Sequence, residues 1–303
     1  MKVLVAIDNS TSSETVLHAA VTRLWPERTT FCVLNIVNLQ RFERLPALIE
    51  DATHESQRLV QSGAKRISDG GYEAVPKSSP GNPRTDISCF AKEWGADLIL
   101  VGSHGHSAVG RFLLGSVAQG VLRTAPCSVE IVRRTPPSAS PIKVLFATDG
   151  SDCSVAAAHA IAAQTWPQGS VFKVLSVEEL VVAGNQMEAA SLSAVYPATL
   201  LDKLIAQSQD RARSAVEKAK DILGRAGLAL DPGDPMPIGE PRSVILDIAK
   251  DWEADLVVVG SHGRRGLDRF LLGSVSETVA IHAPCSVRVV WGRQYPKGNS
   301  HVL

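Results

Sequence analysis

The chain has 303 residues, 45% of them hydrophobic and 20% charged, and its 31 lysines and arginines balance its 31 acidic residues. This composition is typical of a globular protein of roughly two domains. A formal net charge of zero excludes a global basic field, so we expect no nucleic-acid partner. The five cysteines form no C-x-x-C pair, which argues against a disulfide framework or a cysteine-rich zinc site and favours free buried thiols in a reducing compartment.

The N-terminal run MKVLVAID is too short for the core of a signal peptide, because an aspartate follows its few apolar residues. No stretch approaches the roughly 20 apolar residues that span a bilayer. The sequence therefore predicts a cytoplasmic protein with no membrane partner.

Apolar runs and helix-start signals alternate along the first half of the chain. The apolar runs predict strands at residues 2–7, 30–37, 72–78, 97–102 and 128–133. Capping residues, helical periodicity and helix-ending glycines or prolines predict helices at about 10–25, 51–69, 84–94 and 115–124. Because strands and helices alternate, we expect a mostly parallel sheet with helices on both faces.

The second half of the chain repeats the first. The segment KVLVAIDNS at residues 2–10 returns as KVLFATDGS at 143–151. Further along, WGADLILVGSHG at 94–105 returns as WEADLVVVGSHG at 252–263. A repeat of this length is a whole domain rather than a solenoid unit, so the order of elements should recur.

The offset between the copies grows from 141 to 158 residues, so the second copy carries about 17 extra residues. We place this insertion in the alanine- and serine-rich segment 181–198. The stretch TPPSASP is typical of a short linker between the copies. We therefore predict two domains of the same fold, at residues 1–138 and 139–303.

Two strand ends in each copy carry residues suited to a ligand. In open α/β sheets, ligands bind beyond the carboxyl ends of the strands, where the strand order reverses. The first strand ends at Asp8 and Asp149 in the two copies, and the fourth ends at Gly102 and Gly260. A carboxylate at this place can accept hydrogen bonds from ribose hydroxyls. We therefore expect the binding crevice between these strand ends.

The loops after the fourth strands share one pattern, G-x-x-G, nine residues, then G-S. They read GSHGHSAVGRFLLGS at 102–116 and GSHGRRGLDRFLLGS at 260–274. Glycines let the backbone approach phosphates, and the Gly-Ser pair opens a helix whose free N–H groups favour an anion. One such loop alone is typical of an ordinary turn and cap, but here the pattern occurs twice between a strand and a helix. It is not a Walker A loop, and we interpret it as a phosphate-binding loop.

With these motifs the chain resembles the universal stress protein family, in the tandem-domain form of its ATP-binding branch. The motif G-2x-G-9x-G-[ST] is complete in both copies, and the resemblance runs from Lys2 to about Trp291. It implies an α/β fold of two tandem open parallel five-stranded sheets, of strand order 3-2-1-4-5, with helices on both faces. It also implies that the last strands pair the two domains within the chain, and it leaves open a further homodimer.

The resemblance further implies two sites for ATP. The aspartates would contact the nucleoside, the ends of the second strands would read adenine through their backbone, and the glycine loops would hold the phosphates. The first site would comprise Ala6, Asp8, Ile36, Gly102, Ser103, His104, Gly105, Gly115, Ser116 and Val117. The second would comprise Ala147, Asp149, Gly150, Val177, Gly260, Ser261, His262, Gly263, Arg264, Gly273, Ser274 and Val275. Mg²⁺ would accompany the nucleotide, helped by Ser116 and Ser274, with no direct protein ligand assigned.

The two loops differ in charge. The first copy has His106 and Ser107 where the second has Arg264 and Arg265. Two arginines beside a polyphosphate favour tighter ATP binding by the second copy, although a solvated pair is the alternative interpretation.

Other chemistry-bearing residues have simpler interpretations. His104 and His262 have no second ligand at metal spacing, so we expect a structural or contact role for them. Trp94 and Trp252 are expected to pack rather than to stack on a base. The charged run at 211–221 is typical of a solvated helix face.

The sequence thus favours an ATP-binding stress-response regulator with at most slow hydrolysis and an unidentified protein partner, since no clear base or arginine finger is evident. Two alternatives stay open. One is an interaction scaffold whose nucleotide is structural or absent, with 181–198 as the partner site. The other is a true ATPase or nucleotidyl transferase, with His106 as its acid or base.

Overall fold

The computed structural model describes residues 1–38, 47–104, 114–135, 140–178, 198–233, 235–263 and 272–292. The predicted boundary at residue 138, most of the segment 181–198, and Gly105, His106, Ser107, Arg264 and Arg265 lie outside these residues. The first half contains β1 (Lys2–Ala6), α1 (Thr11–Thr22), β2 (Thr30–Val37), α2 (Ala47–Asp69), β3 (Glu73–Pro80), α3 (Pro83–Trp94), β4 (Leu98–Gly102), α4 (Ser116–Thr124) and β5 (Ser128–Val132). The second half contains β6 (Lys143–Ala147), α5 (Asp152–Ala162), β7 (Val171–Leu175), α7 (Ala198–Arg225), β8 (Ala229–Leu230), α8 (Pro241–Asp251), β9 (Leu256–Gly260), α9 (Ser274–His282) and β10 (Ser286–Val290).

The described strands form one continuous ten-stranded sheet, in the order β3-β2-β1-β4-β5-β10-β9-β6-β7-β8. Pairing within each half is parallel and follows the predicted order 3-2-1-4-5. The last strands, β5 and β10, pair antiparallel, which fuses the two halves. The expectation of two separate five-stranded sheets is therefore corrected. Each half alone would leave its last strand as an unpaired edge, and the pairing removes both edges.

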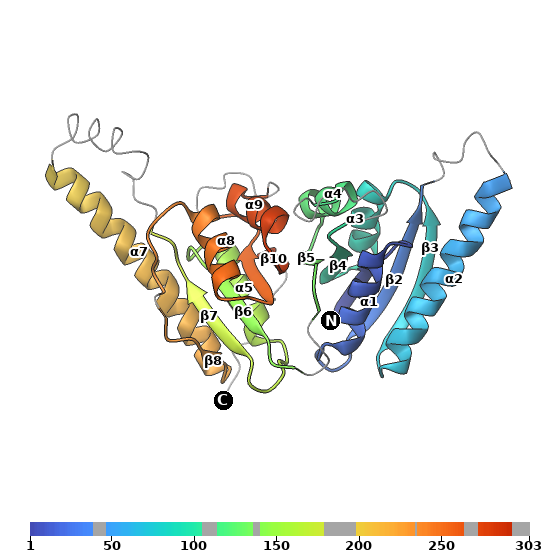
Figure 1. The fold of residues 1–303 in the computed structure, drawn as a ribbon, viewed down its shortest axis with the longest axis horizontal. Coiled ribbons are helices and arrows are strands. Elements are labelled where there is room, and N and C mark those ends of the chain that lie inside the picture. The colour runs from blue at the N-terminus through green and yellow to red at the C-terminus, as the bar shows by residue number, and fades with distance from the viewer. Residues whose placement is uncertain are drawn as a thin grey trace.

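Alternate residues of the strands face opposite helical layers, as period-2 side-chain geometry requires. Leu4 and Ala6 belong to a core with residues of α3, α4, α8 and α9, and this core runs across both halves. Val3 and Val5 belong to a core under α1 and α2, and β6 and β7 contribute to a third core under α5 and α7. Figure 1 shows α2 and α7 at opposite outer ends of the molecule, with β5 and β10 meeting in the middle.

Local signals place the helix ends. Pro83 stands in the first turn of α3, where its missing N–H costs nothing, and the Asn82 side chain accepts a hydrogen bond from the Arg84 N–H at 3.1 Å. Gly95 ends that helix in the left-handed region, at φ 72°. In the second half the third strand, β8, has only two residues, and three prolines follow it within seven positions. Proline cannot donate to a ladder, so the sheet is shorter at this edge.

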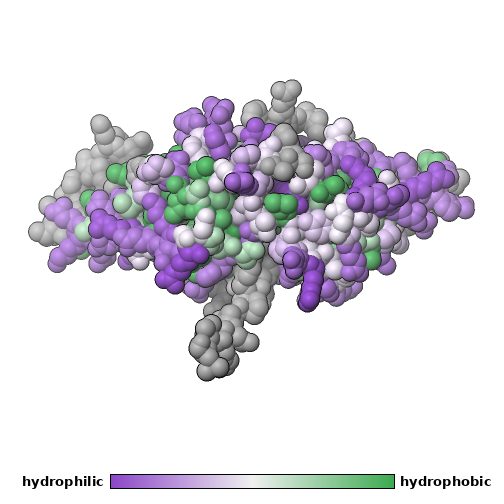
Figure 2. Space-filling view, turned by 90° about the horizontal axis from the view of Figure 1, so that it is seen from below, coloured by the Kyte–Doolittle hydropathy of each residue, from purple (hydrophilic) through white to green (hydrophobic). Residues whose placement is uncertain are grey.

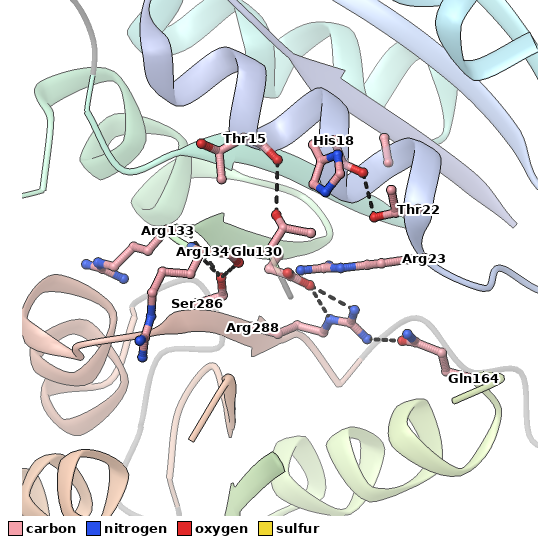
Figure 3. Close-up of polar contacts among 12 residues, drawn as sticks. Thr15, His18, Thr22, Arg23, Glu130, Arg133, Arg134, Gln164, Ser286 and Arg288 are labelled. Carbon is pink, nitrogen blue, oxygen red and sulfur yellow. Dashed lines mark hydrogen bonds and ion pairs between the residues drawn. The ribbon is translucent and has the colours of Figure 1, made fainter. Parts of the chain in front are cut away.

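A buried charge cluster crosses the seam between the halves (Figure 3). Glu130 of β5 is fully buried and lies opposite Arg288 of β10, whose Nε and Nη2 are 2.9 and 2.8 Å from Glu130 Oε2. Arg23, after α1, pairs with the other carboxylate oxygen, and Gln164 accepts from Arg288 Nη1 at 2.6 Å. Burial alone would raise the pKa of Glu130, but the charges and hydrogen bonds of the two arginines hold it below its usual value.

The outer surface agrees with a folded chain of mixed polarity. Figure 2 shows a face with mostly hydrophilic residues at its ends and hydrophobic patches nearer its middle. Among the described residues, no helix combines the length and apolar character needed to cross a bilayer. The five cysteines are free thiols, and Cys89 is exposed whereas the expectation was burial for all. Trp94 and Trp252 pack against the shared core, as expected.

Candidate functional site

A cavity of about 760 Å³ opens in the second half, where the strand order reverses between β9 and β6. The carboxyl ends of β6, β7 and β9 reach it through Ala147, Leu175 and Gly260. This position follows from the parallel sheet, because the neighbouring crossovers leave in opposite directions at the switch point. The volume lies in the range of small-molecule and cofactor sites.

Nine residues of the predicted second site line this cavity. Gly150 and Ser261 lie beside it without lining it, and Arg264 falls outside the described residues. The lining residues that the sequence predicted are Ala147, Asp149, Val177, Gly260, His262, Gly263, Gly273, Ser274 and Val275.

Asp149 and Gly263 meet at the edge of the cavity. A methyl group on Gly263 would lie 2.7 Å from Asp149 Oδ2, so a larger residue there would require the carboxylate to move. Asp149 Oδ1 accepts a hydrogen bond from the Ser151 N–H at 3.0 Å. The loop backbone and the carboxylate are thus brought together as the sequence predicted, at a place where ribose hydroxyls could reach the acid.

His262 is held by neighbours on several sides. Its Nδ1 lies 3.1 Å from Ser261 Oγ, and Cys153 Sγ lies 3.4 and 3.6 Å from its two ring nitrogens. A sulfur nearly equidistant from both nitrogens at this range lies over the face of the ring. The Trp291 ring meets the imidazole edge-on at 6.4 Å between centroids. This packing fits the structural or contact role that the sequence suggested better than a proton shuttle.

Helix α9 begins at the cavity. The Gly273 N–H donates to Ser261 O at 2.7 Å, which closes the loop onto the end of β9. Gly273 is the N-cap and has no side chain, and no described side chain caps this end. Ser276 Oγ donates to Gly260 O at 2.5 Å, which ties the first turn to the strand. The first-turn N–H groups and the helix dipole therefore face the cavity ready for an anion.

The wall opposite the strands holds residues that the sequence argument missed. Arg211 and Ser208 of α7 and Glu240 and Arg242 at the start of α8 line the cavity. The run at 211–221 is a solvated face as predicted, but its first arginine stands at the cavity. The tetrapeptide GNPR at residues 81–84 returns as GEPR at 239–242, and this repeat, which contains Arg242, was a signal for this wall.

Glu240 caps α8. Its Oε2 accepts from the Ser243 N–H at 2.9 Å, and Arg242 Nε donates to Oε1 at 2.6 Å. Burial works to raise the pKa of Glu240, but the hydrogen bonds from Arg242 and Ser243 outweigh it and lower the pKa to about 2. The carboxylate is thus charged at neutral pH and compensates part of the charge of Arg242.

The first half repeats the local geometry of the second. Asp8 Oδ1 accepts from the Ser10 N–H at 3.0 Å, the same distance as in the second half. Gly115 N–H donates to Ser103 O at 2.7 Å, as Gly273 does to Ser261. Ser10 Oγ lies 3.5 Å from His104 O, against 3.3 Å for the corresponding pair. The structure therefore brings the aspartate and the loop ends together in both halves.

The remaining residues of the predicted first site occupy matching positions. Gly102 ends β4 close to the start of α1, where a methyl group would lie 2.8 Å from Ser12 Cβ. His104 Nδ1 lies 2.9 Å from Ser103 Oγ. Ala6 ends β1 and Ile36 lies in β2, both buried, while Ser116 and Val117 form the first turn of α4 after Gly115. Gly105 lies outside the described residues.

Comparisons with known proteins agree with this architecture. A model of the universal stress protein family matches residues 1–133 and 142–290. A universal stress protein of Methanocaldococcus jannaschii is 32% identical over 149 residues, which are 49% of this chain and 81% of that protein. One of Mycobacterium bovis is 30% identical over 209 residues, which are 66% of this chain and 62% of that protein.

A solved structure shows the same fold across nearly the whole chain. A universal stress protein of Archaeoglobus fulgidus matches with a TM-score of 0.65 at 21% identity, and the match covers 95% of each chain. A universal stress protein solved in complex with cAMP matches 50% of this chain and 99% of that chain, at 21% identity and a TM-score of 0.32. Because the family model matches nearly the whole of both halves, the chain belongs to the universal stress protein family.

Proposed function

We propose that this protein is a regulator that binds ATP, with the second-half cavity as its best-formed site. The observation that carries the proposal is the cavity itself, where an aspartate, a glycine loop and an uncapped helix start converge. Each feature suits one part of a nucleotide, and all lie at the switch point of the sheet.

The lining divides into apolar and polar parts. Leu175, Val177 and Ile245 offer apolar surface for a base, and we expect the backbone of Val177, which lines the same cavity, to read adenine. Asp149 suits the ribose hydroxyls. Ser274 and the first turn of α9 suit the phosphates, with Mg²⁺ accompanying them.

The matching geometry of the first half supports a second ATP site there, built on Asp8 and the loop that ends at Ser116. We propose regulation rather than fast catalysis for both sites, because the described lining presents groups that position a ligand. Occupancy by ATP would shift the population of conformations that a partner recognises, provided the two states bind ATP with different affinity.

Calorimetric titration of the full chain with Mg-ATP tests the proposal. We expect saturable binding with a stoichiometry between one and two, weakened at least tenfold at the second site by D149A, which removes the ribose acceptor. If titration of the chain with Mg-ATP, ADP, AMP or cAMP gives no heat of binding, the proposal is refuted.

A further inference from the structure

The two halves can be aligned residue by residue along α2 and α7, the helices that flank the two sites. Phe31 and Phe172 occupy the same place in the second strand of each half, and they pair with Ala74 and Leu230. The offset between the paired residues is therefore 156 in this region. Glycines with positive φ at the same offset end both helices, Gly71 at 92° and Gly227 at 73°. The buried positions also coincide at this offset, namely Ser56 with Ala212, Val60 with Val216, and Ile67 with Leu223.

This alignment makes Glu55 the counterpart of Arg211. Arg211 lines the second-half cavity, so the first-half site has a carboxylate where the second has a guanidinium. Glu55 Oε1 accepts a hydrogen bond of 2.7 Å from Asn9 Nδ2. Asn9 directly follows Asp8, so this bond ties the loop after β1 to helix α2 beside the predicted ribose contact.

The second half cannot form that bond. Gly150 stands in the place of Asn9 and has no side chain, and its φ of 73° favours glycine. Arg211 has no ion-pair partner within the part of the chain that the structure describes. The charge of Arg242 is partly balanced by Glu240 at 2.6 Å, which leaves Arg211 as the uncompensated cation of this wall.

We infer that the two sites differ in the ligand they select, and that position 55/211 sets the difference. The second-half site favours nucleotides by their number of phosphates, because the guanidinium of Arg211, which lines the same cavity, attracts a polyphosphate. At the first-half site, added phosphates do not increase the affinity, because Glu55 repels their negative charge and the Asn9–Glu55 hydrogen bond holds the carboxylate in place. This inference rests on the proposed nucleotide binding and names the ligand class of each site.

The experiment uses full-length chains in which one site at a time is disabled. D8A leaves the second-half site and D149A leaves the first-half site. Calorimetric titrations with Mg-ATP, Mg-ADP and AMP then give three dissociation constants for each site. In the D8A chain we expect ATP to bind at least about tenfold more tightly than AMP. In the D149A chain we expect the dissociation constants of ATP and AMP to differ by less than about threefold.

Charge variants then assign the effect to the named residues. R211Q in the D8A chain should weaken ATP about tenfold and AMP less than about threefold. E55Q in the D149A chain should strengthen ATP more than AMP. R213Q is the matched control, since Arg213 lies on the same helix, is exposed and does not line the cavity. We expect R213Q to leave the dissociation constants of both sites unchanged, and circular dichroism to show that all variants stay folded.

The outcomes separate this inference from the proposed function. The inference would be overturned if the two sites had the same preference for ATP over AMP, or if R211Q weakened ATP and AMP binding equally. Nucleotide binding itself would still stand in either case. No binding of any nucleotide to the unmutated chain would overturn the proposed function itself.

Discussion

At the residue scale, the glycines of the loop motif have a packing role beside any ligand role. A methyl group on Gly260 would lie 2.8 Å from Ser154 N and 2.9 Å from Cys153 C, so the end of β9 touches the backbone of α5. The sequence indicated the need for a glycine here, because we expected the backbone to approach a phosphate closely. It could not tell that the approaching group is a helix of the same domain, since that contact depends on tertiary packing.

G260A should therefore destabilise the ligand-free protein by about 1–3 kcal/mol, because the added methyl group forces two backbone segments apart. G224A provides the control. Gly224 lies in α7, and a methyl group added there would meet no atom within 4 Å apart from its chain neighbours and the backbone of its own helix, so alanine should be neutral or stabilising by up to about 1 kcal/mol. Urea unfolding of both variants measures the difference, and equal stability of G260A and the unmutated chain would contradict the packing role.

At the element scale, strands were predicted better than the edges of the sheet and the walls of the site. β2 matches its predicted range of 30–37, and α3 begins one residue before its prediction, because apolar runs and proline signals act locally. The shortness of β8 and the position of Arg211 at the cavity could not be predicted, since they depend on how α7 lies against β7 and β8. The capping role of Glu240 was also missed, although its counterpart Asn82 is a common N-cap residue.

The cap at Glu240 gives a pH dependence with a definite sign. Its folded pKa is about 2, below the ordinary 4.5, so the ionised form stabilises the fold above pH 4.5. That contribution is lost as the pH falls from about 4.5 to about 2. The side chain is 44% exposed, so we expect no more than about 1 kcal/mol. The difference in unfolding free energy between the unmutated chain and E240Q should be constant above pH 5 and shrink below 4.5; a pH-independent difference would contradict this role.

At the scale of the whole molecule, the seam between the halves decides the architecture. Glu130 and Arg288 occupy equivalent places in the two copies, and they face each other across the antiparallel pair of β5 and β10 (Figure 3). Two glutamates or two arginines at these paired positions would place like charges side by side in a buried environment. Further contacts support the seam, including Arg133 Nη2 to Ala280 O at 2.6 Å and Arg123 Nη2 to Glu277 at 2.6 Å. The resemblance implied pairing of the last strands, but the buried charge pair required the register to be known.

A double-mutant cycle tests this seam. E130M should cost about 3–5 kcal/mol, because Arg288 is left buried without its carboxylate, and R288M should cost a similar amount. The double variant E130M/R288M should be less destabilised than the sum, since it removes the fully buried carboxylate together with Arg288 and leaves only Arg23, whose side chain is 16% exposed, without its partner. Unfolding free energies of the four chains give the coupling, and additive losses would show that the two residues do not act as a pair.

The most direct test of nucleotide binding is the content of the purified protein. The full chain is denatured, and the released small molecules are identified and counted per chain by chromatography, with the D149A chain as control. We predict release of adenine nucleotide with ATP as the main species, and less of it from D149A. If no adenine nucleotide is released, and the same preparation fails to bind added Mg-ATP, the cavity is not a nucleotide site and the account is wrong.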